Sequence, residues 1–378
     1  VLNIGAATGQ MARSAGELEA EAIAFGSGNG SIVLNHSESN YELSANISGA
    51  GRIDAENGIT TLSGNNSYSG GTTISAGTLK GTATSFGSGG IANNASLVVD
   101  GAGTLSNAIS GSGSLEKTGN GNLILTGDSS YTGTTEVSSG KLSVNGSLAS
   151  VISVADGATL GGSGTIGGAT VRSGGTFAPG NSIGTLTSMG NVTFADASTY
   201  AVEIDSFGNS DRLAVTGTVT IANDVNLVIT PSTGSLNFAF GAKYLILTAT
   251  GGVTGAFSDV VGNLDYLKTA VTKSTDNNTV YLLMKRQSFG PGSFAASTST
   301  VNARSAANAV EAAGEGSALY DAAFYLQLDE TQSAFSQLAG ELHPSLAMAL
   351  INRSQLTRDV ILGRLRSAFG GVDGRPIL

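Results

Sequence analysis

A long segment of the sequence occurs twice, and this repetition constrains the fold more than any other feature. The copies begin at Ile47 and Ile109 and align with one single-residue gap. Their offset equals three smaller units of about 21 residues each, which is the size of one solenoid turn. The aligned pairs are Ile47 with Ile109, Ile53 with Leu115, Leu62 with Leu125, Tyr68 with Tyr131, Ile74 with Val137 and Leu79 with Leu142.

Short strands with period-2 alternation, such as TTISAGTLKG and LILTG, recur from about Ser31 to Met284 and are closed by Gly, Asn or Ser turns. This pattern excludes alternating β/α architectures and leaves a sandwich, a barrel or a solenoid. The solenoid is favoured because the spacing is regular and the turns rarely carry the Asn-Gly or Asp-Gly pairs of two-residue hairpins. The 55 glycines, about twice the usual share, suit the corners. The sequence therefore predicts an all-β right-handed parallel β-helix.

The pattern of apolar residues changes twice along the chain. Around Tyr200 the strands become longer and richer in aromatic residues, as the closed end of a solenoid core requires. After a small polar linker the apolar period becomes helical, with a first helix ending at Gly314 and a last one beginning near Pro344. We expect a β-helix stalk over 1–189, a β cap over 190–286, a linker over 287–300 and a C-terminal helical segment over 301–378.

Charge and residue content exclude several kinds of site. The net charge of −10 argues against nucleic acid, whose phosphates require a basic surface. The chain has no cysteine, so it contains neither a disulfide nor a thiolate metal site, and His36 and His343 are its only imidazoles. We expect His36 to lie at the surface near a turn and His343 to precede a helix. No metal and no cofactor is predicted.

Two enzyme-like motifs lie between Leu160 and Thr187. Gly162 to Gly167 matches G-x-G-x-x-G, but neither a helix nor an acidic residue about 20 positions later follows, so a dinucleotide site is not favoured. Gly180 to Gly184 matches G-x-S-x-G around Ser182, yet the only later histidine is His343. We predict that the glycines of this stretch, Gly161, Gly162, Gly164, Gly167 and Gly168, form corners and that Ile166, Val171 and Phe177 point inward.

A glycan-active β-helix would need carboxylates gathered on one face. In the sequence they are scattered singly, and Glu56 and Glu116, which are nearly equivalent in the two copies, are interpreted as solvated turn charges. The acids concerned are Asp54, Glu56, Asp100, Glu116, Asp128, Glu136 and Asp156. Because clustering across turns cannot be seen in one sequence, this alternative stays open, but no catalytic, cofactor-binding or metal residue is predicted.

The ordered set of motifs resembles the C-terminal part of a bacterial autotransporter passenger, from the type V secretion family. The matching stretches are NSYSGGTTISAGTLKG and its copy, LGGSGTIGGATVRSGGTFAPGNSIGTLT, DRLAVTGTVTI with KYLILTATGGVTGAF, and GELHPSLAMALINRSQLTRDVILGRL. The resemblance implies that about 190–286 is an autochaperone-like cap and that the helical tail leads into the protein's own outer-membrane β-barrel. That barrel is expected to lie outside this sequence, as is any secretion signal.

The resemblance implies a surface-displayed or secreted, non-enzymatic stalk that supports vectorial folding and secretion, with adhesion or another host interaction through an unknown ligand. Two alternatives remain open: a glycan-active β-helix, and a stalk that carries an upstream catalytic head. The tail arginines Arg353, Arg358, Arg364 and Arg366 are either a solvated face or a set of contacts to acidic groups in the barrel pore.

Overall fold

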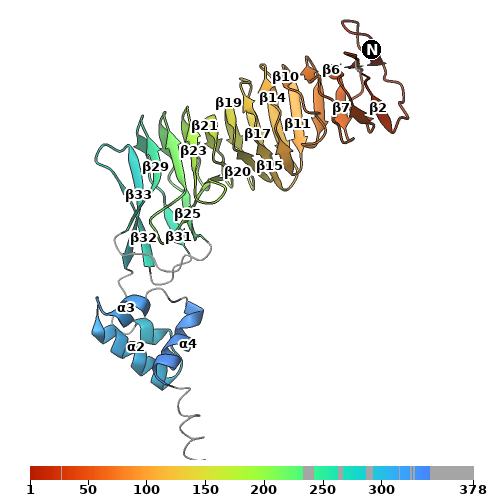
Figure 1. Cartoon of the computed structure of the whole chain (residues 1–378). Helices are drawn as coiled ribbons and strands as arrows, with labels where there is room; N and C mark the ends of the chain where they lie inside the picture. The colour runs from red at the N-terminus through yellow and green to blue at the C-terminus, as the bar shows by residue number, and fades with distance from the viewer. Residues whose placement is uncertain are drawn as a thin grey trace, which may run out of the picture. The chain divides into compact units, whose positions relative to one another are not determined.

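The computed structural model describes residues 1–26, 28–232, 242–262, 267–286, 293–314, 316–323, 326 and 328–340. The chain divides into two compact units, Val1–Asn263 with Thr269–Lys285, and Leu264–Lys268 with Arg286–Leu378. The first unit is a parallel β-solenoid and the second contains short helices (Figure 1). The predicted fold class, a parallel β-helix followed by a helical segment, is confirmed.

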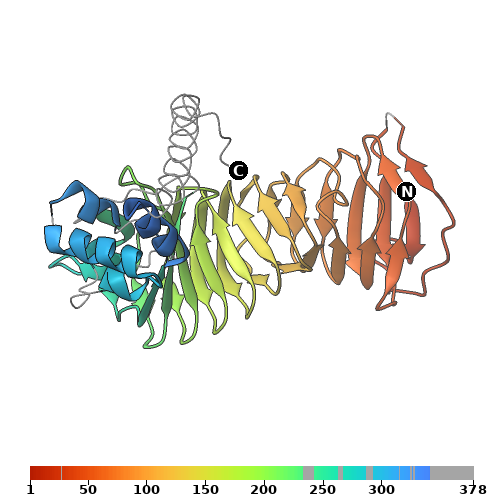
Figure 2. The ribbon, with the colours of Figure 1, turned by 90° about the horizontal axis from the view of Figure 1, so that it is seen from below.

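The strands of the solenoid form three faces, which we call A, B and C, with face C formed from β12 onward, and Figure 2 shows the strands of successive turns lying side by side. Face A contains β1 (Leu2–Gly5), β3 (Ser31–Asn35), β6 (Arg52–Asn57), β8 (Thr72–Ile74), β10 (Ile91–Asn93) and β13 (Ile109–Ser110), and continues through β16 (Asp128–Ser129), β23 (Thr185–Ser188), β26 (Arg212–Val215) and β29 (Lys243–Ala249).

Face B contains β4 (Tyr41–Leu43), β7 (Ile59–Leu62), β9 (Thr78–Gly81), β11 (Ser96–Asp100), β14 (Ser114–Thr118), β17 (Thr135–Val137), β24 (Val192–Phe194), β27 (Val219–Ile221) and β30 (Val253–Thr254). Two long strands, β19 (Ser147–Val154) and β21 (Thr165–Val171), bend from face A into face B.

Face C contains β12 (Gly103–Leu105), β15 (Asn122–Leu125), β18 (Lys141–Val144), β20 (Thr159–Gly162), β22 (Thr176–Pro179), β25 (Thr199–Ile204), β28 (Asn226–Pro231) and β31 (Asp259–Gly262). The remaining strands are β2 (Ala22–Ala24), which pairs with β5 (Asn46–Ser48), and β32 (Leu267–Lys273) and β33 (Thr279–Arg286) near the end of the solenoid.

The core is built from columns of apolar side chains, because strands in register place every second side chain of each turn directly above that of the turn before. On face B, Leu79 pairs with Leu97 and Leu97 with Leu115, and all three are fully buried. Ile166, Val171 and Phe177 are also fully buried, so their predicted inward orientation is confirmed.

The turns of the solenoid around the repeats contain fewer residues than the sequence repeat predicts. Register partners on successive turns are 18 residues apart for Asp100 with Thr118. They are 19 residues apart for Asp128 with Ser147. The interpretation of the repeat as three units of about 21 residues each was therefore wrong.

The two sequence repeats lie on different faces of the solenoid. From Ile53 on face A, three turns lead through Thr72 and Ile91 to Ile109. Leu115, the repeat equivalent of Ile53, comes after Ile109 and lies on the next strand, β14 of face B. The offset between the copies is thus three turns and one further face.

Toward its C-terminal end the solenoid becomes thicker. The separation of register partners on face B grows to 27 residues between β24 and β27. It grows further, to 34 residues, between β27 and β30. Aromatic rings fill the wider turns: the centroid of Phe194 lies 5.9 Å from that of Phe177 and 5.6 Å from that of Tyr200. Strand β33 then pairs antiparallel with β29, which ends the parallel stacking on face A.

The described helices of the second unit are α1 (Ser293–Ala296), α2 (Val301–Ala313), α3 (Ala318–Ala323) and α4 (Leu328–Leu338). The Thr300 hydroxyl caps α2 by accepting from the Ala303 N–H, and α2 ends at Gly314 as predicted. Across the described part of the chain, no helix has the length and apolar character needed to cross a membrane. His343, Pro344 and the four tail arginines lie outside the described residues.

Candidate functional site

The G-x-G-x-x-G stretch forms strands rather than a nucleotide-binding loop. Gly161 and Gly162 belong to β20, Gly167 and Gly168 belong to β21, and β21 takes the place that a helix would occupy. The predicted corner role holds for Gly164, in the bend between the two strands, and for Gly167 and Gly168, where β21 passes from face A to face B. The reason for glycine is close packing between turns: a Cβ on Gly162 would lie 2.2 Å from the Val144 carbonyl oxygen.

Ser182 of the G-x-S-x-G stretch is exposed in a bend after β22, at the edge of a pocket of about 170 Å³. Lys141, Glu203 and Asp211 line the same pocket, together with Asn181, Thr230 and backbone of the bend. No histidine is among the lining residues in the described part of the chain. The arrangement thus lacks the imidazole base that would activate a serine nucleophile.

Asp211 is the titratable group in this pocket with the most altered environment, and sequence reasoning did not single it out. Its side chain is buried, and its two carboxylate oxygens accept hydrogen bonds from the backbone N–H groups of Gly184 and Glu203, both at 2.9 Å. Burial raises the pKa of Asp211 to about 7, and the nearby Glu203 adds to this, while the two backbone hydrogen bonds oppose it. The carboxyl group ties the bend after β22 to β25.

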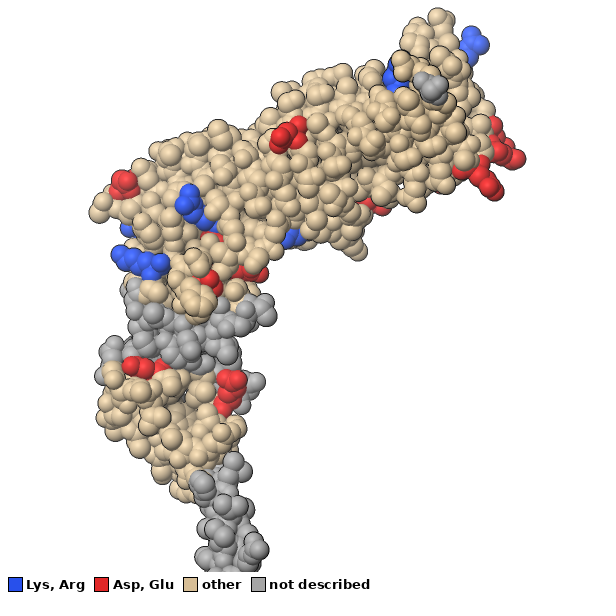
Figure 3. Space-filling model, in the orientation of Figure 1, with Lys and Arg blue, Asp and Glu red and all other residues tan. Residues whose placement is uncertain are grey.

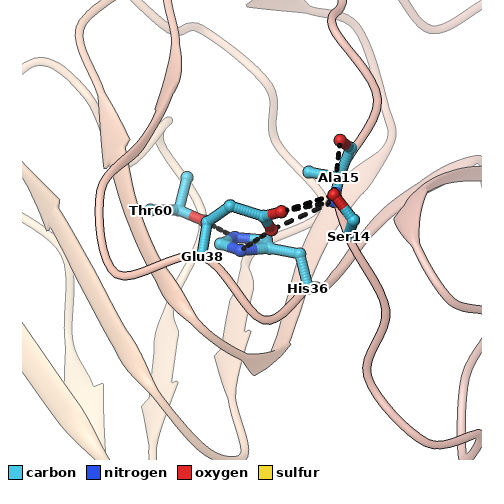
Figure 4. A network of polar contacts seen from close by, with 5 residues as sticks. All are labelled: Ser14, Ala15, His36, Glu38 and Thr60. Atoms are coloured by element: carbon cyan, nitrogen blue, oxygen red, sulfur yellow. Dashed lines mark hydrogen bonds and ion pairs between the residues drawn. The ribbon is translucent and has the colours of Figure 1, made fainter.

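His36 lies in a polar network inside the solenoid, so the prediction of a surface histidine was wrong (Figure 4). The imidazole is fully buried, with Nε2 2.6 Å from the Thr60 hydroxyl and Nδ1 3.2 Å from a carboxylate oxygen of Glu38. Glu38 in turn accepts from the Ser14 hydroxyl at 2.8 Å and from the Ala15 N–H at 3.0 Å. Burial lowers the pKa of His36, and Glu38 opposes this effect.

The network joins a carboxylate, an imidazole and a hydroxyl in the same order as a catalytic triad, but its hydroxyl is not accessible to solvent as the nucleophile of an active site must be. Thr60, which would be the nucleophile, is only 1 % exposed, so a substrate cannot reach its hydroxyl. The network instead fastens the N-terminal segment: Arg13 forms a parallel bridge with His36, and the Ser37 N–H donates to the Arg13 carbonyl. Its role is to hold residues 13–15 against the next turn.

Two of the carboxylates that were scattered in the sequence are paired with arginines, and two others share one hollow. Asp54 and Glu136 each accept from an arginine, at 2.9 Å from Arg52 and 2.8 Å from Arg172. Asp100 and Glu116 line a hollow of about 620 Å³ on face B. Glu56 and Glu116 are half-buried strand residues of β6 and β14, so their interpretation as solvated turn charges was wrong. Figure 3 shows that charged side chains are sparse on the face in view.

Metal-ligating side chains do not gather into a group of three or more anywhere in the described ranges. Buried Lys117 is another polar residue that sequence reasoning missed, because it occupies an inward position of β14 where apolar side chains are the rule. Its ammonium group donates to the carbonyls of Thr118, Gly119 and Ser139. It is a structural contact between two turns.

The repeats that place Tyr68 and Tyr131 in the core match a known family. Residues 55–80 and 115–144 match the Passenger-associated-transport-repeat. The chain carries the repeat of autotransporter passengers. In both repeats the buried tyrosine hydroxyl lies within hydrogen-bonding distance of a threonine four residues later, 2.6 Å for Tyr68 with Thr72 and 2.5 Å for Tyr131 with Thr135. A passenger of this family is surface-displayed or secreted.

Two curated relatives of this passenger, both named extracellular serine protease and both from Serratia marcescens, share its sequence over most of its length. One is 33% identical over an alignment of 312 positions and the other 30% identical over 308, and each alignment covers 70% of this chain. The aligned part makes up 29% of the first relative and 30% of the second. The chain therefore spans less than a third of the length of the curated relatives it matches.

Proposed function

We propose that this passenger segment is a non-enzymatic shaft that supports vectorial folding during secretion and carries an adhesive or other host-contacting surface. The observation that carries the proposal is the difference between the two ends of the solenoid. At the C-terminal end β33 crosses antiparallel onto β29, whereas at the N-terminal end β1 pairs with β3 along one edge. A capped end that folds first offers a finished edge to each following turn.

In this proposal, residues 190–286 are the cap, residues 1–189 are the stalk that stacks on it, and 287–300 and 301–378 are the linker and the helical segment that leads to the outer-membrane barrel of the whole protein. The aromatic cluster of Phe177, Phe194, Tyr200 and Phe257 supports the order of events, because three of its rings lie within the cap and contact Phe177 or one another, so that the cap has an aromatic core against which the stalk can stack. Docking of each turn then opposes backward movement without ATP.

The folding order is tested by pulse-labelling hydrogen exchange during refolding of residues 1–378. Amides of β25, β28 and β29 are expected to gain protection before those of β6, β7 and β9. If the N-terminal turns are protected first, or all turns at once, the cap does not template the stalk and the proposal is wrong.

A second candidate is that the whole protein carries a catalytic head and that this segment is the shaft of an enzyme. The names of the two relatives favour it, since both are extracellular serine proteases of which this chain matches less than a third. Labelling of the full-length gene product with a fluorophosphonate probe separates the two. A labelled serine outside residues 1–378 supports the shaft of a protease, whereas labelling of Ser182 contradicts a non-enzymatic segment.

A further inference from the structure

The hollow on face B lies over four consecutive turns and is lined by residues of β7, β9, β11 and β14. Its central column is Thr61, Lys80, Val98 and Glu116, which follow one another in strand register. Val98 occupies an outward position yet is only 8% exposed, because it lies between the longer side chains of Lys80 and Glu116. A short side chain between two long ones produces the depression, and the volume of about 620 Å³ is within the range of ligand sites.

Most of the residues that line the hollow carry a hydroxyl or a carboxylate. The Thr118 hydroxyl donates to Asp100 at 2.9 Å, and the Ser138 hydroxyl donates to Glu116 at 2.7 Å. Both carboxylates are thus held in place with lone pairs to spare, which lowers the entropy cost of accepting further hydrogen bonds. The hydroxyl-bearing side chains around the hollow are Thr61, Ser63, Thr78, Thr82, Ser96 and Thr118.

The geometry of face B excludes the common modes of peptide binding. β7, β9, β11 and β14 each have parallel partners on both sides, so they offer no free edge to which a peptide strand could be added. The apolar side chains that line the hollow are Ile59, Leu62 and Val98; Leu62 is fully buried and Val98 nearly so, which leaves Ile59 as the one partly exposed apolar side chain in this lining.

The charges around the hollow limit the class of ligand that it could bind. One cation, Lys80, and two carboxylates, Asp100 and Glu116, line the hollow, and the chain carries a net charge of −10. Acidic polysaccharides and nucleic acids are therefore disfavoured. The chemistry that matches many hydroxyls, fixed acceptors and a single donor cation is a neutral molecule rich in hydroxyl groups.

We propose that this hollow binds a neutral oligosaccharide that lies along the solenoid axis, with its hydroxyls donating to Asp100 and Glu116 and accepting from Lys80. Four turns at the usual strand spacing extend over roughly 14 Å, which accommodates a short run of sugar units. The inference rests on the proposed function, because it names the ligand class of the host-contacting surface.

The test is calorimetric titration of residues 1–378 with three neutral tetrasaccharides, cellotetraose, maltotetraose and the N-acetylglucosamine tetramer, and with tetragalacturonate as the acidic comparison. At least one neutral tetrasaccharide is expected to bind with a millimolar dissociation constant. The double variant Asp100→Asn, Glu116→Gln is expected to weaken that binding about tenfold or more, equivalent to about 1.4 kcal/mol, since hydrogen bonds to a charged acceptor are stronger than those to the neutral amides that replace it.

Asp156→Asn is the control for loss of a surface carboxylate, because Asp156 is exposed in a turn outside the hollow. The proposal is overturned if no neutral tetrasaccharide binds at concentrations of about 10 mM, if the acidic comparison binds best, or if the double variant binds like Asp156→Asn. Thermal unfolding of each variant checks that the solenoid is intact. A negative titration leaves the folding order of the passenger untouched, since hydrogen exchange tests that order independently.

Discussion

The carboxylate of Asp211 accepts a hydrogen bond from the backbone N–H of Gly184, 27 residues earlier, at 2.9 Å. This contact joins the bend after β22 to the residue directly before β26, where the turns begin to lengthen. Burial of the Asp211 carboxyl group raises its pKa to about 7 from an ordinary 3.8. In the unfolded chain the group ionises near pH 4, whereas in the folded chain it keeps its proton until about pH 7. The contribution of Asp211 to stability is thus greatest in acid and falls as the pH rises between these values.

Asp211→Asn is expected to remove this part of the pH dependence. Urea unfolding of the wild type should lose free energy relative to the variant as the pH is raised from 4.5 to about 7.5, with an upper bound of roughly 4 kcal/mol from the shift of the pKa. The difference between the two proteins isolates Asp211 from the other titrating groups. Parallel curves for wild type and variant would contradict the raised pKa.

Substitution at Gly162 should be far more costly than at Gly157. Both residues have positive φ, +111° and +70°, so alanine is strained at each, but a Cβ on Gly157 meets nothing within 4 Å. At Gly162 the added carbon would lie against the Val144 carbonyl, and the two turns would have to separate. We expect a loss of about 3 kcal/mol or more for Gly162→Ala and about 1 kcal/mol for Gly157→Ala. Chemical denaturation measures both, and equal losses would show that backbone conformation alone requires glycine.

The two repeat tyrosines should differ in their tolerance of phenylalanine. In Tyr131→Phe, the Thr135 hydroxyl keeps its contact with the Ser150 hydroxyl at 2.5 Å. In Tyr68→Phe, the buried Thr72 hydroxyl loses its contact with the Tyr68 hydroxyl. We therefore expect a cost of about 2 kcal/mol for Tyr68→Phe and about 1 kcal/mol for Tyr131→Phe, measured by urea unfolding. A larger cost for Tyr131→Phe than for Tyr68→Phe would contradict the idea that the Ser150 contact compensates for the lost tyrosine hydroxyl.

His36 should titrate below its ordinary pKa of 6.5, because burial disfavours the imidazolium more than Glu38 stabilises it. The unfolded chain then takes up a proton near pH 6.5 while the folded chain does not, so the contribution of His36 to stability is lost as the pH falls below that value. The ring proton resonances of the two histidines, assigned with His36→Gln, give the midpoint directly. A midpoint at or above 6.5 would contradict this account.

The sequence was sufficient for the solenoid and for its inward positions. Ile166, Val171 and Phe177 could be placed because strand alternation has a period of two, and burial follows from that period alone. The length of a turn could not be read from the repeat, since similarity between Ile53 and Leu115 states which residues correspond but not how many residues complete one revolution.

Polar groups inside the solenoid were harder to predict. His36 has polar neighbours in the sequence, and its burial depends on Thr60 and Ser14, which come from other turns. Asp100 and Glu116 belong to different strands but line one hollow, because the length of the turn between them sets β14 in register against β11. Contacts of this kind depend on register, which a single sequence does not contain.

The displacement of the two repeats by one face has a consequence for how such a shaft could grow. If the unit that separates Tyr68 from Tyr131 were duplicated in tandem, each copy would be rotated by a third of a revolution relative to the last. A surface feature encoded in the unit would wind around the shaft like the thread of a screw, and only every third copy would face the same way. Lengthening the shaft by such units would distribute a binding surface around all of its faces. Copies of that surface would then not lie in a row along one face, where they could bind one partner together with high avidity.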